Sequence, residues 1–261
     1  MASGRKQAFY SARRRWYNRG KKAEEMEEFE RALDPVRGSD PEFVTILERF
    51  FEEEVRRVPL DARLRALAIL AALIGCQGLD VFSAVLPELL GEPLTAEEVR
   101  ETVYQAAAYL GLGRTAPFLK AMDEALCRAG ISLPLPAGER VSGDRVETGN
   151  RVQVELFGEG MRGFAESGPA ETRHINRWLA GNCFGDYYTR AGLGPREREL
   201  ITFFCLAGQG GCEPQLVSHA RGNLCAGNDR ETLIAAVSHC LPYLGYPRSL
   251  NALRCIDEAA K

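Results

Sequence analysis

The sequence predicts an all-α protein made of two diverged tandem copies of one helical repeat. Apolar residues recur at three- and four-residue spacing, and no stretch shows sustained alternation with β-branched residues. One pattern of residues also occurs twice along the chain. With 261 residues the chain is long enough for two such units, since domains commonly have ~100–200 residues.

The repeat is clearest where the run YLG at residues 109–111 recurs at 243–245, 134 positions later. Eight of the seventeen aligned positions that start with these runs are identical. The pattern RxRxL at residues 63–67 recurs at 196–200, at an offset of 133. The two offsets differ by one residue, so we expect one residue of slippage in an intervening loop.

Three further boundaries follow from composition. Residues 131–150 are rich in Pro, Gly and charge without an apolar period, which predicts a linker. We therefore expect a degenerate N-terminal repeat at 24–130 and a C-terminal repeat at 151–261. Residues 1–23 hold eight Lys or Arg and no acidic residue, which predicts a basic arm or leading helix, with a transit peptide as the alternative.

The C-terminal repeat shows start and stop signals for several helices. Residues 196–206 read as a mostly buried helix. A second helix begins near Pro214 and ends at Gly227, because Pro suits a first turn and Gly suits the left-handed cap. A third begins at Asp229 as N-cap and runs to about Leu241.

The N-terminal repeat carries matching signals. Thr95-x-x-Glu98 is a capping box, in which the two side chains satisfy backbone donors at a helix start. Residues 66–75 form an apolar run comparable with its counterpart in the second copy. In the C-terminal repeat, Pro247 follows the second YLG turn and begins the last helix. Each copy is therefore predicted to be an antiparallel helical bundle.

The bulk composition argues against several classes of partner. The formal net charge of −3 gives no overall attraction to nucleic acid. The longest apolar run has about ten residues, short of the ~18–20 that a membrane span needs. Three scattered histidines do not have zinc-ligand spacing, so neither a metal nor another cofactor is expected. Eight cysteines in a long chain without an export signal favour reduced thiols and a cytoplasmic protein.

The densest group of reactive residues lies in the C-terminal repeat. Cys212 precedes a helix, where the dipole favours thiolate, and His219 follows two turns later on the same face. Glu199 lies among apolar residues, where burial would suit it to proton transfer. The three together offer an acid or base, a nucleophile and a proton shuttle.

A structural interpretation competes with this one. Glu199 would pair with an arginine, Cys212 would fill space, and His219 would bind a backbone carbonyl. The matching positions of the N-terminal repeat are Ala66, Gly78 and Val85, so the fold can be built without the trio. We therefore expect all chemistry in residues 151–261, with the first copy as a structural partner.

Four further residues are candidates for binding a substrate. Arg196 and Arg198 can hold a carboxylate through bidentate contacts, and His239 is a candidate for lining the same pocket. Tyr243 is also a candidate, although Tyr109 occupies the matching place in the other copy, which favours packing for both.

The order of these residues resembles the carboxymuconolactone decarboxylase family. The resemblance rests on Arg198-Glu199-Leu200, on His219 after a Gly-rich turn, on Gly227, and on Tyr243-x-Gly245-x-Pro247, and it covers roughly 152–260 and weakly 60–125. It implies two tandem helical-bundle repeats like those of the AhpD-like alkylhydroperoxidases of the same superfamily. The active site of those proteins is Cys-x-x-Cys-x-x-x-His preceded by a helix glutamate.

In this chain the first cysteine of that motif is Cys212 and the histidine is His219, but Gln215 replaces the second cysteine. A dithiol relay needs a resolving partner, so this departure puts peroxidase chemistry of that kind in doubt. Other internal thiols are candidates for the resolving role; they are Cys183, Cys205, Cys225 and Cys240.

Three functions stay open at this point. The first is a decarboxylase-like enzyme in which His219 and Glu199 manage protons around a small carboxylated or lactone substrate. The second is a thiol-dependent peroxidase or redox protein that uses Cys212. The third is a non-catalytic binding or assembly protein.

The resemblance also implies the assembly state. Single-repeat members of the family form hexamers, so a fused two-repeat chain is expected to form a homotrimer that mimics a hexamer. Light scattering should then report about three times the 28.8 kDa of one chain. A monomer at micromolar concentration would contradict this expectation.

Overall fold

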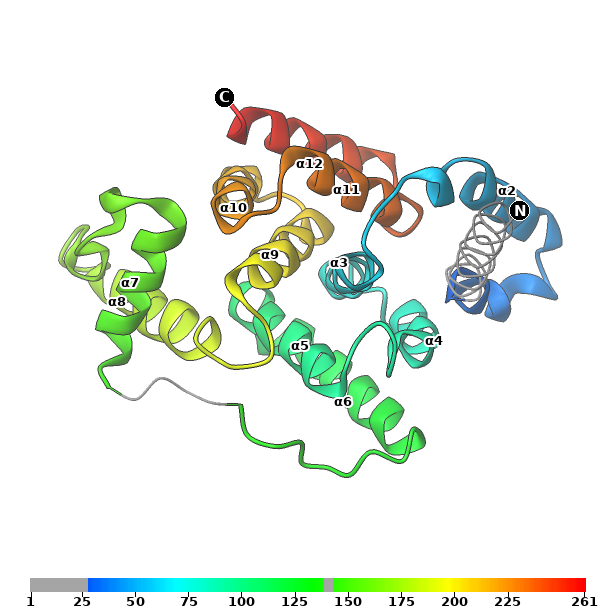
Figure 1. The fold of residues 1–261 in the computed structure, drawn as a ribbon, viewed down its shortest axis with the longest axis horizontal. Helices are drawn as coiled ribbons and strands as arrows, with labels where there is room; N and C mark the ends of the chain where they lie inside the picture. The colour runs from blue at the N-terminus through cyan, green and yellow to red at the C-terminus, as the bar shows by residue number, and fades with distance from the viewer. Residues whose placement is uncertain (1–27, 139–142) are drawn as a thin grey trace, which may run out of the picture. The chain divides into compact units, whose positions relative to one another are not determined.

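The computed structural model describes residues 28–138 and 143–261, and the predicted basic arm at 1–23 lies outside this range. Within the described residues the regular elements are helices, apart from an isolated bridge between Leu90 and Leu94 (Figure 1). The all-α prediction is therefore confirmed. The chain divides into two compact units, Met1–Arg57 and Val58–Lys261.

The described part of the first unit consists of three short elements. They are a helix at residues 28–37, α2 (Pro41–Glu53) and a 3-10 turn, η1 (Val55–Arg57). The rings of Phe29 and Phe51 stack at 4.3 Å between centroids. Arg37 Nη1 lies 2.6 Å from Glu48 Oε1 on the surface. The boundary at residue 57 falls inside the predicted N-terminal repeat, whose later part belongs to the second unit.

The second unit contains the remaining helices of both repeats. The helices before the connection are α3 (Ala62–Gly75), α4 (Leu79–Leu89), α5 (Ala96–Leu110) and α6 (Leu112–Arg128). Those after it are α7 (Arg145–Phe157), α8 (Arg173–Trp178), the π-helix η4 (Leu179–Tyr187), α9 (Pro195–Gln209), α10 (Glu213–Ala226), α11 (Arg230–Leu244) and α12 (Tyr246–Ala259), with 3-10 turns η2 (Glu159–Met161) and η3 (Phe164–Glu166).

Local signals in the sequence locate most helix ends. Thr95 and Glu98 form the predicted capping box at the start of α5. Asp229 Oδ1 accepts the Thr232 N–H at 2.7 Å, which caps α11. Gly227 ends α10 with a left-handed φ of 95°. These caps satisfy backbone groups that lack helical partners, so a short-range pattern is enough to predict them.

The predicted linker is too long at its C-terminal end. Asp144 accepts the N–H groups of Val146 and Glu147, and α7 begins at Arg145 inside the predicted range of 131–150. The first turns of α7 are polar and lack an apolar period. They are helical because α7 packs closely on η4 along its length.

The two central helices, α3 and α9, meet through equivalent residues of the two repeats. A Cβ on Gly75 would lie 2.5 Å from Cys205 O, and a Cβ on Gly208 would lie 2.7 Å from Ala72 O. Gly75 and Gly208 are 133 positions apart, as are Ala72 and Cys205. The crossing is therefore pseudo-symmetric, and each side requires a residue without a Cβ.

The same pseudo-symmetry continues outward from this crossing. Helix α5 of the N-terminal repeat packs on α9, and α11 of the C-terminal repeat packs on α3 (Figure 1). Each central helix is thus covered by a helix of the other copy. A site on α9 can therefore include side chains from both repeats.

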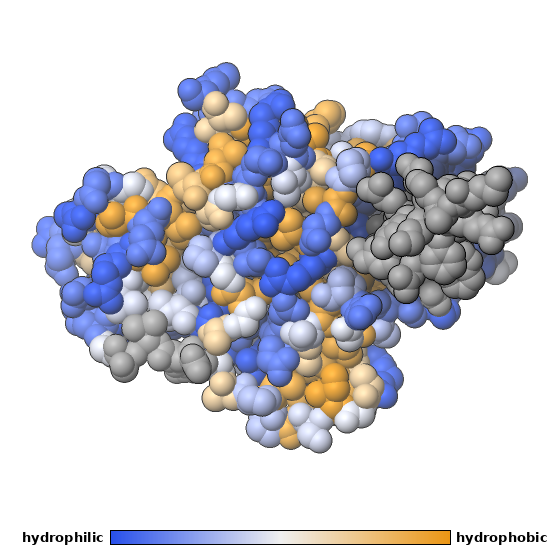
Figure 2. Space-filling view, viewed as in Figure 1, coloured by the Kyte–Doolittle hydropathy of each residue, from blue (hydrophilic) through white to orange (hydrophobic). Residues whose placement is uncertain are grey.

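The surface of this unit includes apolar side chains. On the face drawn in Figure 2, hydrophobic residues are interspersed with hydrophilic ones. The large apolar residues most exposed in this unit are Leu112, Trp178, Tyr246 and Leu250. Among the residues that the structure describes, no helix combines the length and apolar character required to cross a bilayer.

The α3–α9 crossing generates a prediction about stability. Gly208→Ala should lower the free energy of unfolding by about 1–3 kcal/mol, the usual cost of overpacking a core, because the new methyl group meets the backbone of α3. Urea unfolding measures the change. Gly113→Ala is the matched control, since nothing lies within 4 Å of a Cβ there. Equal stability of the two variants would contradict the close crossing.

Candidate active site

Glu199 on α9 and His219 on α10 form a buried pair. Glu199 Oε2 lies 2.9 Å from His219 Nδ1. The Glu199 side chain is fully buried and the His219 side chain is 10% exposed. Two members of the trio predicted from the sequence are therefore in direct contact. The structural interpretation, in which Glu199 pairs with an arginine, does not describe this geometry.

The local packing of α10 makes room for this pair. A Cβ on Gly222 would overlap the Glu199 carboxylate, so the glycine leaves the space that the carboxylate occupies. One turn from His219, Asn223 Nδ2 donates to Glu199 O at 2.9 Å and to His219 O at 2.7 Å. The amide of Asn223 thus ties the backbones of α9 and α10 together beside the pair.

Two tyrosines complete the polar cluster around Glu199. Tyr188, just after η4, donates its hydroxyl to Glu199 Oε1 at 2.6 Å. The hydroxyl of Tyr109 on α5 lies 3.0 Å from that of Tyr188. Burial raises the pKa of both phenols well above the ordinary value, so both are neutral donors.

Tyr109 departs from the role that the sequence predicts for it. Its repeat position favours packing, yet its hydroxyl lies within the cluster and its ring meets His219 edge-on at 5.2 Å. Tyr109 belongs to the N-terminal repeat. The first copy therefore supplies a polar side chain to the surroundings of the pair, while Glu199 and His219 themselves lie within residues 151–261.

A chain of hydrogen bonds reaches this cluster from Arg198. Arg198 Nη1 donates to Gln105 Oε1 at 3.0 Å, and Gln105 Nε2 donates to Thr202 Oγ1 at 3.1 Å. Thr202 Oγ1 lies 3.2 Å from the Tyr188 hydroxyl. Since the Tyr188 hydroxyl donates its hydrogen bond to Glu199, it accepts a hydrogen bond from the Thr202 hydroxyl. Every donor in the chain is directed toward the Glu199 carboxylate.

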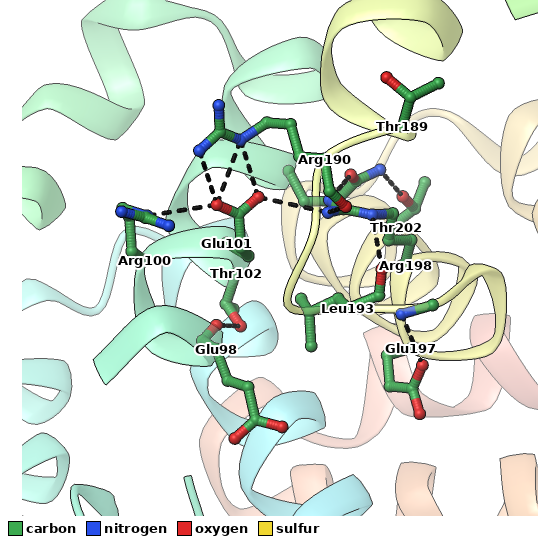
Figure 3. A network of polar contacts seen from close by, with 12 residues as sticks. Glu98, Arg100, Glu101, Thr102, Thr189, Arg190, Leu193, Glu197, Arg198 and Thr202 are labelled. Carbon is green, nitrogen blue, oxygen red and sulfur yellow. Dashed lines mark hydrogen bonds and ion pairs between the residues drawn. The ribbon is translucent and has the colours of Figure 1, made fainter. Parts of the chain in front are cut away.

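Arg198 is not available to a substrate carboxylate. Its side chain is fully buried, and its remaining donors go to Leu193 O at 3.2 Å, Arg190 O at 2.7 Å and Glu101 Oε2 at 3.2 Å (Figure 3). This corrects the prediction that Arg198 binds substrate. The RxRxL pattern marks a structural arginine, and only the fold brings the partners of Arg198 to it.

The carboxylate of Glu101 on α5 is the centre of a buried ion network. Arg190 donates to both of its oxygens at 2.8–3.1 Å, and Arg100 Nε donates at 3.2 Å (Figure 3). Burial alone would raise the pKa of Glu101, but the hydrogen bonds and charges of Arg190 and Arg198 outweigh it and lower that pKa. The network joins α5 of one repeat to α9 of the other.

Three other predicted binding residues lie outside the cluster. Arg196 Nε donates to Asn228 Oδ1 at 2.7 Å and so holds the turn after α10. His239 Nε2 lies 2.9 Å from Val58 O, and burial lowers the pKa of its imidazole to about 4. Tyr243 is half-buried on the same helix as His239.

Pseudo-symmetry explains why His239 does not join His219. His239 and Gln105 are equivalent positions, 134 residues apart. Gln105 on α5 faces α9, so its counterpart on α11 lies against α3 rather than beside Glu199. The sequence alignment of the repeats contains this relation, but the exchange of covering helices between copies is visible only in three dimensions.

Cys212 occupies the N-cap of α10 and points to the end of α9. Its Sγ lies 3.4 Å from Leu206 O and 3.9 Å from Gln209 Nε2, and within the described residues no hydrogen bond joins it to Glu199 or His219. Burial and the charge of Glu213 raise the pKa of this thiol, which is the opposite of the predicted thiolate. Partial burial outweighs the expected effect of the helix terminus.

Another cysteine lies at the cluster instead. Cys183 Sγ is 3.5 Å from the Tyr109 hydroxyl, and burial raises the pKa of its thiol to about 12. The eight cysteines are all free thiols. In the ranges 28–138 and 143–261, no group of three or more His, Cys, Asp or Glu has an arrangement that could hold a metal ion.

His219 Nε2 is the atom of the cluster that is left for a ligand. Nδ1 is engaged by Glu199, and this contact is the hydrogen bond that the imidazole makes among the described residues. The rings of Tyr109 and Phe157 meet the imidazole edge-on at 5.2 and 5.5 Å. The two aromatic rings fix the plane of the imidazole and leave Nε2 without a hydrogen bond to any described residue. The imidazole can therefore take up or release one proton at Nε2.

Comparison with known proteins identifies one family. The model of the carboxymuconolactone decarboxylase family matches residues 41–124 and 174–258, which lie in the two repeats and together make up more than half of the chain. Among curated proteins, none matches the sequence.

The ion network behind the site generates a prediction about pH. Because the pKa of Glu101 is lowered from 4.5, its stabilising contribution is present above that value and is lost as the pH falls through the lowered pKa. Glu101→Gln should remove this component and lower the free energy of unfolding at pH 7 by ~3–5 kcal/mol, since it leaves buried arginines without their partner. Urea unfolding at pH 7 and pH 3 measures both effects.

Glu147→Gln provides the control, because Glu147 is an exposed carboxylate on α7. That variant should keep the pH dependence of the unmodified protein. A Glu101→Gln protein as stable as Glu147→Gln at pH 7 would contradict a central role for the network.

Proposed function

Because the chain belongs to the carboxymuconolactone decarboxylase family, we propose that it is an enzyme that uses His219 as a general acid and base. The substrate is a small carboxylated or lactone compound. The observation that carries the proposal is the contact of Glu199 Oε2 with His219 Nδ1 at 2.9 Å, which leaves Nε2 for the substrate.

Hydrogen-bond polarity supports this role for His219. Glu199 accepts a hydrogen bond from Tyr188 on one oxygen, and as a carboxylate it accepts Nδ1–H of His219 on the other. The neutral imidazole then carries its lone pair on Nε2, the position of a base. When Nε2 takes up a proton, the carboxylate of Glu199 balances the charge of the imidazolium.

A decarboxylation would use this arrangement in two steps. The bond between the substrate carbon and its carboxylate breaks, CO2 departs, and the electron pair stays on the substrate as an enolate. Nε2 of His219, which has taken up one proton from solvent, then delivers that proton to the carbon, and the imidazole returns to its neutral form. The buried, dipole-lined surroundings of Glu199 strengthen each of these electrostatic contacts.

Thiol-dependent peroxide reduction is the second candidate. It is favoured by Cys212, which stands at the first cysteine position of the AhpD-like motif. Two observations weigh against it. Burial raises the pKa of the Cys212 thiol, and Gln215 stands where a dithiol relay has its second cysteine.

Two single substitutions separate these candidates. His219→Ala should lower the rate of carboxymuconolactone decarboxylation by ~10²–10⁴-fold, because it removes the group that carries the proton. Cys212→Ser should retain most of that rate, since Cys212 contacts the end of α9 rather than the pair. Carbon dioxide release measures the decarboxylation, and reduction of tert-butyl hydroperoxide is followed in parallel.

Circular dichroism of both variants checks that each is folded. Loss of peroxide reduction in Cys212→Ser, with decarboxylation absent from the unmodified protein, would favour the redox function. Full activity of both variants in both assays would count against either enzyme.

A further inference from the structure

A cavity of about 440 Å³ lies between the end of α7 and the outer side of α10. This volume falls in the range of ~300–1,000 Å³ that is usual for small-molecule sites. Leu156, Phe157 and Leu224 supply apolar surface to its lining. The cavity is thus suited to a ligand with an apolar body.

Phe157 lies between the cavity and His219. Its ring lines the cavity and meets the imidazole edge-on, at 5.5 Å between centroids and an interplanar angle of 87°. A Cβ on Gly222 would lie 3.0 Å from Phe157 Cε1, so the glycine also admits this ring beside Glu199. The other wall comes from Ser218 and Arg221, the residues next to His219 and Gly222 on α10.

Arg221 supplies a positive charge at the mouth of the cavity. It is exposed and forms no ion pair with any described residue, whereas Arg230 on the next helix binds Asp257 at 2.6 Å. Among the residues that the structure describes, none with a carboxylate side chain lines the cavity. A cation beside an apolar cavity favours a ligand that carries one anionic group, because a guanidinium binds a carboxylate through two parallel hydrogen bonds.

We propose that this cavity binds a small apolar carboxylate, that Arg221 holds its anionic group, and that Phe157 separates the bound molecule from His219. The ring of Phe157 has to rotate before the ligand touches Nε2. Only this last step rests on the proposed function of His219. The assignment gives the anion-binding role to Arg221, in place of the buried Arg198.

Binding of benzoate to the full chain tests the proposal, with benzamide as its neutral counterpart. Calorimetry should show saturable benzoate binding that is about 10-fold or more tighter than benzamide binding, and Arg221→Met should remove most of that difference, because a charge-assisted contact is lost. Arg254→Met is the matched control, since Arg254 is an exposed arginine on α12 that does not line the cavity. Absence of saturable binding, or equal binding to Arg221→Met, overturns the proposal.

A second readout reports on the cavity itself. Cys225 lines the cavity and is exposed, and Cys127 on α6 is exposed but lies elsewhere. Benzoate should slow the alkylation of Cys225 by iodoacetamide and leave that of Cys127 unchanged, as measured by mass spectrometry of the peptides. Equal alkylation of Cys225 with and without benzoate shows that the ligand binds elsewhere and overturns the assignment.

His219→Ala keeps this test distinct from that of the catalytic role. The variant should still bind benzoate and protect Cys225, since His219 does not line the cavity. If His219→Ala binds benzoate and also retains full turnover, the cavity is confirmed as the benzoate site and the role of His219 as a base is refuted. If His219→Ala loses turnover and Arg221→Met leaves benzoate binding unchanged, the role of His219 is supported and the assignment of the cavity is refuted.

Discussion

The buried carboxylate of Glu101 binds the guanidinium groups of Arg190 and Arg198, and the hydrogen bonds around Glu199 depend on this contact. Burying such charges is costly unless every donor and acceptor finds a partner. Here each guanidinium nitrogen of Arg198 has an acceptor, because Nε reaches Leu193 O, Nη1 reaches Gln105 Oε1, and Nη2 reaches Arg190 O besides Glu101. The ion network therefore fixes α5 against α9 and, through Gln105, orients the polar groups that surround Glu199.

The position of that ion network also shows what the N-terminal repeat contributes to the surroundings of Glu199. The N-terminal copy has Val85 where the C-terminal copy has His219, so it cannot build a second pair of the same kind. Its helix α5 nevertheless supplies Glu101, Gln105 and Tyr109 to the surroundings of the first. Pseudo-symmetric exchange of helices makes the two copies interdependent even though only one holds the histidine.

Sequence patterns were sufficient where the cause is local. Caps such as Thr95 with Glu98 and the glycine stop at Gly227 depend on neighbouring residues alone, and the repeat located the central helices. Glu199 and His219 were also singled out, because Glu199 lies beside apolar residues and His219 follows Cys212 by two turns, and the structure places the two in contact. Tyr188 and Thr202 were missed, since nothing in their own segments indicates that their hydroxyls meet at a carboxylate on another turn. Arg198 was misjudged because a free and a saturated arginine look alike in a sequence.

The segment before Tyr188 is a π-helix, in which the Tyr188 N–H reaches back to Cys183 O at 3.2 Å. Such wide turns hold one more residue than an α-helical turn and recur at functional sites. In an α-helix each residue advances the chain by ~100° around the axis, from 3.6 residues per turn. Deleting a single residue from η4 would therefore turn the Tyr188 hydroxyl away from Glu199 without altering any side chain of the cluster. The backbone register of η4 therefore positions this hydroxyl, in addition to the identity of the side chain.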